Sequence, residues 1–167
     1  MKLSVLFENA SLAYPQEMGT IEISCIVTDS RKAIPDSLFL CLRGTKSDGH
    51  EHIREAIDKG ATVVVTEGVR DVCVGGAATI SIENTRIAAS LLYGAWFGNP
   101  QEKLRLVAVT GTNGKTSVSH MIRSILRRAG RACALVGTVG CFSADDRLIE
   151  FEHDPLANMT TPDPAAL

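Results

Sequence analysis

The stretch 61–66, which reads ATVVVT, limits the fold of this chain more than any other feature. Its β-branched residues follow one another without a charged or turn-forming residue between them. A run of this kind is typical of a strand that is buried on both faces. Other elements must cover it from two sides, and the sequence therefore predicts an α/β fold.

Further strands are predicted before and after this run. The segment 21–28 (IEISCIVT) alternates apolar and polar residues, which is typical of a half-buried strand with one apolar face. That face consists of Ile21, Ile23, Cys25 and Val27. Short apolar runs predict two more strands over 38–42 and 78–82.

Two helices are predicted in the first hundred residues. Asp48 and Glu51 stand three residues apart, as in a capping box, and predict the start of a helix that ends at Gly60. Asn84 is the predicted cap of a second helix with apolar residues at helical spacing. The sequence GNP at 98–100 then breaks the chain, and we interpret it as a domain boundary.

A strand–helix–strand unit is predicted after this break, with strands over 104–110 and 132–137. The helix between them has an apolar stripe of Val118, Met121, Ile122, Ile125, Leu126 and Ala129. After Gly140, the sequence up to Leu167 reads as polar loop. We therefore expect an N-terminal domain over 1–100 and the beginning of a second domain over 104–167.

Composition excludes several classes of protein. The 167 residues include 17 Lys and Arg against 19 Asp and Glu, and 45% are hydrophobic, which is unlike a disordered chain. The nearly balanced charge gives no electrostatic reason to expect a nucleic-acid partner. The sequence lacks a secretory segment and any apolar run of about 20 residues, so we expect a cytoplasmic protein without membrane insertion. The five scattered cysteines form no CxxC pair and are interpreted as reduced structural thiols.

The segment 111–116 (GTNGKT) carries the clearest chemical signal, because it lies between a predicted strand and a predicted helix. Gly111 and Gly114 allow the backbone to curl so that N–H groups converge on phosphate oxygens. Lys115 would lie against the outer phosphates, and Thr116 would offer its hydroxyl to magnesium. Val109 stands where the general P-loop pattern has its first glycine, so an ordinary strand–helix turn remains the alternative.

Five segments resemble the Mur ligases, the ATP-dependent amino-acid ligases of peptidoglycan synthesis. The family's nucleotide loop is similar to 109–116 (VTGTNGKT), and its N-terminal domain has segments similar to 28–31 (TDSR) and 48–50 (DGH). The pair 137–140 (GTVG) and 160–164 (TTPDP) resembles the MurE type of that family. From spacing alone, 137–140 is equally well interpreted as a flexible loop.

The resemblance implies an α/β UDP-MurNAc-binding domain followed by the first βαβ part of a P-loop-type ATPase domain. It implies that ATP phosphorylates the terminal carboxylate of a UDP-MurNAc-dipeptide. An amino acid, meso-diaminopimelate or L-lysine, then attacks the acyl phosphate and forms an amide bond. ATP and Mg²⁺ are the implied cofactors, and the oligomeric state is left open.

The resemblance also assigns site residues. Lys115 is the implied catalytic residue, and Thr116 is the implied magnesium ligand. The implied cofactor-binding residues are Gly111, Thr112, Asn113, Gly114, Lys115, Thr116 and Ser117. The implied substrate-binding residues are Thr28, Ser30, Thr45, Lys46, Ser47, Thr160 and Thr161.

The sequence stops shortly after TTPDP, so we expect that the 167 residues alone are not a competent ligase and that 104–137 is loosely held. A truncated, non-catalytic module that binds UDP-sugar and nucleotide is the alternative, and another P-loop phosphotransferase is a third. The four histidines are interpreted as surface or capping residues rather than metal ligands, and Asp145 and Asp146 as solvated loop charges.

Overall fold

A computed structural model of the chain describes residues 1–44, 48–68 and 75–149. The chain divides into two compact units, Met1–Leu104 and Arg105–Leu167. The first unit contains a parallel sheet covered by helices, which confirms the predicted α/β fold class. The domain boundaries expected from the sequence remain a prediction.

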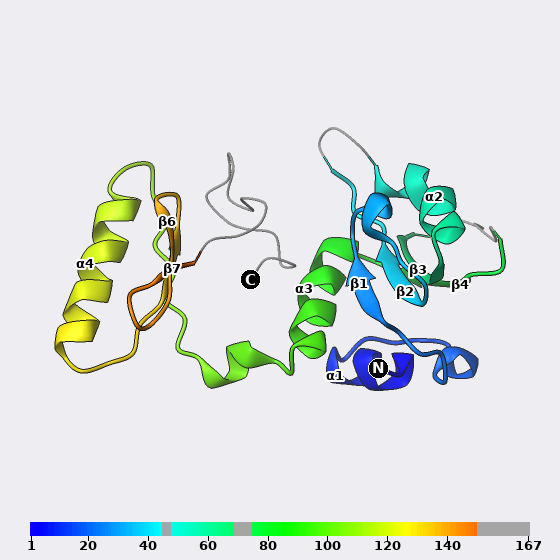
Figure 1. The fold of residues 1–167 in the computed structure, drawn as a ribbon, viewed down its shortest axis with the longest axis horizontal. Helices are drawn as coiled ribbons and strands as arrows, with labels where there is room; N and C mark the ends of the chain where they lie inside the picture. The colour runs from blue at the N-terminus through cyan, green and yellow to red at the C-terminus, as the bar shows by residue number, and fades with distance from the viewer. Residues whose placement is uncertain (45–47, 69–74, 150–167) are drawn as a thin grey trace. The chain divides into compact units, whose positions relative to one another are not determined.

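Four parallel strands form the sheet of the first unit, in the order β1-β2-β3-β4 (Figure 1). They are β1 (Cys25–Val27), β2 (Ser37–Leu40), β3 (Ala61–Glu67) and β4 (Ala78–Ile82). In β3, the valines that the sequence predicts to be buried on both faces are indeed buried. All four strands end at the same edge of the sheet, which is where open parallel sheets place ligands.

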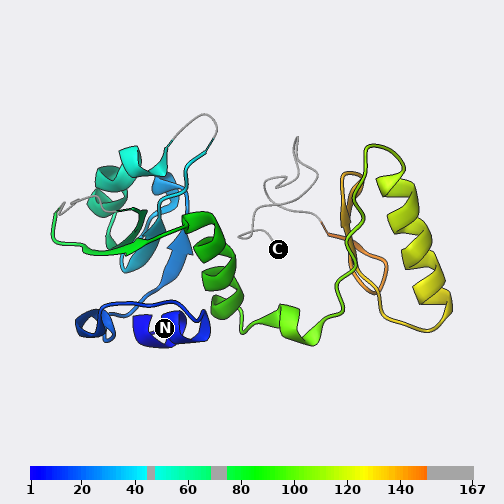
Figure 2. The ribbon, with the colours of Figure 1, turned by 180° about the vertical axis from the view of Figure 1, so that it is seen from behind.

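Helices cover the two faces of this sheet (Figures 1 and 2). Alternate residues of β2 and β3 pack on α1 (Leu3–Asn9) and α3 (Thr85–Trp96) on one face, and on α2 (Ile53–Asp58) on the other. Asn84 caps α3, as predicted, by accepting hydrogen bonds from the N–H groups of Arg86 and Ile87. The short 3₁₀ helices are η1 (Gln16–Met18), η2 (Ser30–Lys32), η3 (Gly49–His52) and η4 (Pro100–Lys103).

The prediction for the first strand is wrong in its length and in its faces. The strand β1 has only three residues, and both of its faces are buried. Ile23 and Ile26 belong to the core shared with α1 and α3, whereas Val27 belongs to the core shared with α2. A parallel sheet covered on both sides removes the alternation on which the prediction depended.

The second unit contains one helix and a small antiparallel sheet. Helix α4 (Lys115–Arg128) is followed by β5 (Leu135–Gly137), β6 (Gly140–Phe142) and β7 (Leu148–Ile149), in the order β5-β6-β7. Figures 1 and 2 show α4 alongside these strands. The polar loop expected after Gly140 is therefore wrong as far as Ile149, because a hairpin with a polar turn occupies this stretch. Residues 150–167 lie outside the described part.

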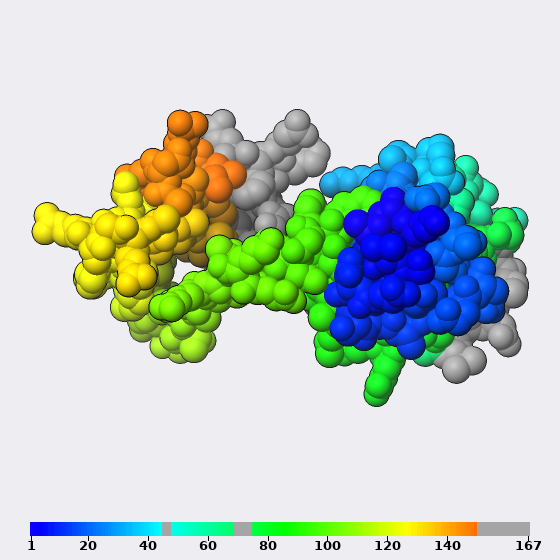
Figure 3. Space-filling view, turned by 90° about the horizontal axis from the view of Figure 1, so that it is seen from below, coloured from blue at the N-terminus to red at the C-terminus, as the bar shows by residue number. Residues whose placement is uncertain are grey.

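No strand forms over 104–110, in contrast to the prediction. Leu106 is 76% exposed and Val107 is 66% exposed, so this segment lacks the neighbouring strand that a buried strand requires. On α4, Met121 and Ile125 of the predicted apolar stripe are also mostly exposed. In Figure 3, side chains in the yellow range, which includes α4 and the residues after it, project from the surface. This exposure agrees with the expectation that 104–137 is incompletely packed.

Within the described ranges, no helix combines the length and the hydropathy that are needed to cross a membrane. The same residues contain no cluster of three or more His, Cys, Asp or Glu side chains that could hold a metal ion. Cys25, Cys133 and Cys141 are free thiols, Cys41 is buried, and Cys73 lies outside the described residues.

Candidate functional site: a nucleotide loop and the carboxyl edge of the parallel sheet

The nucleotide loop predicted from the sequence joins the exposed segment 104–110 to α4. Gly111 has a φ of +146° and Gly114 has a φ of +77°, and both values favour glycine. Gly114 is also the N-cap of α4, so that the helix begins at Lys115. The two glycines therefore produce the tight turn that directs the loop into the helix.

The backbone N–H groups at the start of α4 are available to a ligand. The amide of Val118 donates to the carbonyl of Gly114 at 2.9 Å. Within residues 75–149, the amides from Gly111 to Ser117 donate to no backbone carbonyl. The first turn of α4 contains no acidic residue, so the positive end of the helix dipole is not neutralised there. This combination favours an anion such as phosphate.

The side chains of the loop add a cation and hydroxyl groups. Lys115 folds back over the loop, and its Nζ donates to the carbonyl of Gly111 at 2.7 Å. The Oγ1 of Thr116 lies 3.4 Å from the Oγ1 of Thr138, in the turn between β5 and β6. The remaining predicted residues, Thr112, Asn113 and Ser117, are exposed. The seven predicted cofactor-binding residues thus form one continuous loop and first helical turn.

Arg123 connects α4 to the strands of the second unit. Its guanidinium donates to the carbonyls of Cys133 and Ser143 and to the carboxylate of Asp146, the last at 2.6 Å. Arg127 also pairs with Asp146, at 2.7 Å. Hydrogen bonds from Arg123 and then from Arg127 lower the pKa of Asp146. Asp146 thus pairs with two arginines, while its side chain stays 49% exposed in the turn between β6 and β7, in agreement with the interpretation as a solvated loop charge.

The predicted substrate residues Thr28 and Ser30 follow β1 at the carboxyl edge of the parallel sheet. Thr28 is half-buried, and Ser30 is buried. The Oγ of Ser30 donates to the Oε2 of Glu55 at 2.6 Å, and this bond is the main cause of a lowered pKa of Glu55. The hydroxyl hydrogen of Ser30 is thus used within the fold, and its lone pairs are what it can offer to a ligand.

The other predicted substrate residues, Thr45, Lys46, Ser47, Thr160 and Thr161, lie outside the described residues. The two residues that flank 45–47 are nevertheless described. Arg43 and Asp48 form an isolated antiparallel bridge, so the chain enters and leaves this segment at one place.

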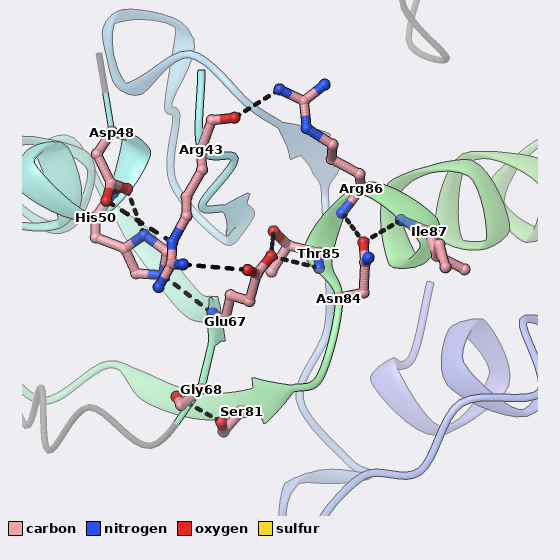
Figure 4. A network of polar contacts seen from close by, with 10 residues as sticks. All are labelled: Arg43, Asp48, His50, Glu67, Gly68, Ser81, Asn84, Thr85, Arg86 and Ile87. Atoms are coloured by element: carbon pink, nitrogen blue, oxygen red, sulfur yellow. Dashed lines mark hydrogen bonds and ion pairs between the residues drawn. The ribbon is translucent and has the colours of Figure 1, made fainter. Parts of the chain in front are cut away.

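His50 lies at one end of a polar network beside this bridge (Figure 4). Its side chain is 1% exposed, so the interpretation as a surface or capping residue is wrong. Its Nδ1 contacts the carboxylate of Asp48, and its Nε2 accepts a hydrogen bond from the N–H of Glu67 at 3.0 Å. Because Nε2 accepts, the proton lies on Nδ1 and is donated to Asp48. His50 thus joins the carboxyl end of β3 to the start of η3.

Glu67 extends the network to α3. Its carboxylate accepts from the N–H and the hydroxyl of Thr85, which lowers the pKa of Glu67, and it pairs with Arg43 at 3.5 Å. Arg86 donates to the carbonyl of Arg43 at 2.6 Å. The sequence analysis did not single out Arg43, Glu67 or Arg86. Their position at the ends of β2 and β3, and at the start of α3, is the signal that could have found them.

The loop at the start of α4 has the geometry of a phosphate-binding loop of a nucleotide-binding protein, and sequence comparison identifies the family. Residues 22–108 match the family model described as Mur ligase family, catalytic domain, and residues 109–167 match that of the Mur ligase middle domain. The chain belongs to the Mur ligase family.

Curated relatives point to one type within the family. The chain is 42% identical, over 140 residues, to the UDP-N-acetylmuramoyl-L-alanyl-D-glutamate--2,6-diaminopimelate ligase of Syntrophomonas wolfei, covering 83% of this chain and 28% of the relative. It is 35% identical to the ligase of the same name from Listeria monocytogenes serotype 4b, covering 100% of this chain and 32% of the relative. The chain therefore spans about a third of the length of these relatives.

Solved structures show the same fold. A structure titled as a UDP-N-acetylmuramoyl-L-alanyl-D-glutamate--2,6-diaminopimelate ligase matches with a TM-score of 0.67 at 22% identity, covering 99% of this chain and 32% of that one. A UDP-N-acetylmuramoylalanyl-D-glutamyl-2,6-diaminopimelate--D-alanyl-D-alanyl ligase from Acinetobacter baumannii matches with a TM-score of 0.51 at 29% identity. That match covers 76% of this chain and 28% of the other.

Proposed function

We propose that this chain is the substrate- and nucleotide-binding part of a ligase that extends the peptide of a cell-wall precursor. In this proposal, the full protein uses ATP to add a third residue, meso-diaminopimelate or L-lysine, to UDP-MurNAc-L-Ala-D-Glu. The names of the relatives at 42% and 35% identity support the reaction and favour diaminopimelate. Because the chain spans about a third of their length, turnover is assigned to the longer protein.

The observation that carries this proposal is the geometry of the loop from Gly111 to Ser117. Its amides lie at the start of a 14-residue helix and donate to no backbone carbonyl among residues 75–149. Lys115 lies across the same loop. Backbone donors and one cation at a helix N-terminus are what a nucleotide phosphate requires.

Thr116 is the proposed contact to magnesium. Magnesium prefers oxygen ligands and keeps several waters, so one threonine hydroxyl near the phosphates fits this ion. When bound, the ion would neutralise phosphate charge during phosphoryl transfer. Lys115 would bind the outer phosphates and orient them toward the carboxylate that becomes the acyl phosphate. An amino group then attacks the acyl carbon, and phosphate leaves.

The UDP end of the substrate is assigned to the first unit, through Thr28, Ser30, Thr45, Lys46 and Ser47. Thr160 and Thr161 of the second unit are proposed as further substrate-binding residues. Of these seven residues, Thr28 and Ser30 are described. Residues 1–100 would form the UDP-MurNAc-binding domain, and 104–167 would begin the ATP-binding domain. The location of Thr28 and Ser30 after β1 supports this assignment, because ligands of parallel sheets bind at the carboxyl ends of strands.

A titration of the 167-residue chain with Mg²⁺-ATP and, separately, with UDP-MurNAc-dipeptide tests the proposal. Lys115→Ala should weaken ATP binding at least about tenfold, because a charge-assisted contact is lost, and should leave UDP-sugar binding unchanged. Arg147→Ala is the control, since Arg147 is an exposed cation of the same unit and pairs with Asp145 in the turn between β6 and β7. Unchanged ATP binding by Lys115→Ala would contradict the nucleotide site.

The same titration separates the alternatives. A chain that binds ATP but not the UDP-sugar would favour another P-loop phosphotransferase. If the chain binds both ligands but the full protein shows no ligase turnover, the result would favour a non-catalytic binding module.

A further inference from the structure

One face of α4 is polar and contacts the hairpin formed by β5 and β6. Thr116, His120, Arg123 and Arg127 follow one another at intervals of four, three and four residues, which places them on the same side of the helix. Each has a contact beyond α4. Thr116 lies near Thr138, the ring of His120 meets the ring of Phe142 edge-on, and Arg123 and Arg127 both bind Asp146.

Arg123 is the fixed point of this face. It is buried, and its guanidinium binds two carbonyls and one carboxylate and lies over the ring of Phe142, 5.2 Å from the centroid. A buried guanidinium with these partners tolerates little displacement, because moving it would leave N–H donors of a buried cation without acceptors. The hairpin is therefore held at one position along α4.

The turn of this hairpin lies beside the nucleotide loop. Only Thr138 and Val139 connect β5 to β6, because Gly137 pairs with Gly140. Gly140 has a φ of +141°, which favours glycine, so the exit of the turn depends on this residue. Holding the hairpin in place thus holds Thr138 near Thr116.

We propose that Thr138 is a positioning residue of the nucleotide site, which orients the hydroxyl of Thr116 toward the phosphate-bound cation. The two Oγ1 atoms are 3.4 Å apart, longer than the usual O–H···O distance of about 2.8 Å. Such a contact restricts the rotation of Thr116 but leaves its lone pairs available. The ion pairs of Arg123 and Arg127 with Asp146 hold the strands against α4, and the strands in turn hold Thr138 beside Thr116 in the first turn of the helix.

This proposal rests on the proposed nucleotide site, so its test includes one measurement without nucleotide. In the 167-residue chain, a nuclear Overhauser contact between the side chains of Thr116 and Thr138 should be present. Asp146→Asn should weaken it, because the charge that binds Arg123 and Arg127 is lost, while asparagine tolerates the φ of +74° at this position. Asp145→Asn is the matched control, because Asp145 pairs with Arg147 instead.

The second measurement compares ATP affinity with Mg²⁺ and with excess EDTA. Thr138→Val should weaken Mg²⁺-ATP binding about three- to tenfold and leave metal-free ATP binding unchanged, because only the orientation of Thr116 is lost. Thr138→Ser keeps a hydroxyl and should stay within about twofold of the unmodified chain. Asp146→Asn should change binding in the same direction as Thr138→Val, and Asp145→Asn should not.

The outcomes separate the two proposals. Absence of the Thr116–Thr138 contact, or normal Mg²⁺-ATP affinity in Thr138→Val, would overturn the role of Thr138 and leave the nucleotide site intact. Failure of the unmodified chain to bind Mg²⁺-ATP at all would overturn the nucleotide site and the role of Thr138 with it.

Discussion

The imidazole of His50 accepts a hydrogen bond from the backbone N–H of Glu67, 17 residues further along the chain. The same ring donates to Asp48, so one buried side chain satisfies polar groups from two elements. This arrangement holds the start of η3 against the carboxyl end of β3.

His50→Leu should lower the free energy of unfolding of the first unit by about 1–3 kcal/mol, because the N–H of Glu67 would be buried without a partner. Trp96, the only tryptophan, lies at the end of α3 and reports on this unit by fluorescence during urea unfolding. His52→Leu is the control and should change stability by less than about 0.5 kcal/mol, since the His52 side chain is 46% exposed. Equal effects of the two substitutions would argue against the network.

Thr66→Val should leave the first unit as stable as before or stabilise it by up to about 1 kcal/mol. Thr66 is fully buried, and its Oγ1 has no hydrogen-bond partner among the described residues, so valine removes an unsatisfied hydroxyl at similar volume. Thr85→Val is the matched control, because Thr85 is equally buried but donates to Glu67 at 3.0 Å. It should destabilise by about 1–2 kcal/mol. The same urea titration measures the free energy of unfolding of both variants. A larger loss for Thr66→Val than for Thr85→Val would refute this account.

The carboxyl group of Asp29 should titrate with a pKa of about 2. A two-point contact with the Arg31 guanidinium is the main cause, and the N–H of Arg31 adds a further bond. Because the pKa is lowered from its ordinary value of 3.8, the stabilisation is complete above about pH 4 and is lost as the pH falls toward 2. Carbon-detected NMR of the carboxyl measures the midpoint directly.

Asp29→Asn is the control for this titration. Asparagine keeps an oxygen for the N–H of Arg31 but carries no charge, so the acid-dependent part of the stability should shrink. A midpoint near 3.8 in the unmodified chain would show that Arg31 does not hold the carboxylate.

Backbone amides over 105–110 should exchange with solvent much faster than those of β3. Among described residues, these amides donate to no backbone carbonyl, and Leu106 and Val107 are mostly exposed, whereas β3 is paired on both sides. Hydrogen exchange followed by NMR or mass spectrometry compares the two segments within one sample. Strong protection over 105–110 in a monomer would contradict the structure of this segment.

Local pattern was enough to predict the elements that carry their own signals. The strand β4 (Ala78–Ile82) has the predicted bounds, and the Asn84 cap of α3 and the starting turn of α4 lie where the sequence indicates. The hairpin after Gly140 was missed because its apolar residues are few and its turn is polar. The strand predicted over 104–110 failed for a different reason, since a strand forms only when a neighbouring strand supplies its hydrogen bonds.

The residues of the candidate sites also differ in whether local sequence or distant contacts determine their role. The loop from Gly111 to Ser117 is continuous in the sequence, so its residues could be predicted together. His50, Glu67 and Arg123 acquire their partners from distant segments, and no local spacing reveals those contacts. The sequence signal for part of this network is a polar residue at the end of a buried strand, such as Glu67 after the valines of β3.

The carboxylate of Glu67 has an electrostatic consequence for substrate capture. By accepting from Thr85 at the first turn of α3, it neutralises the positive pole of that helix from within the protein. A polyanion that approaches this edge therefore gains little long-range attraction from the dipole of α3 itself, in contrast to the charge of Arg86 on the same helix turn. Substitution by glutamine would unmask that pole and should accelerate the encounter with negatively charged molecules, most visibly at low ionic strength.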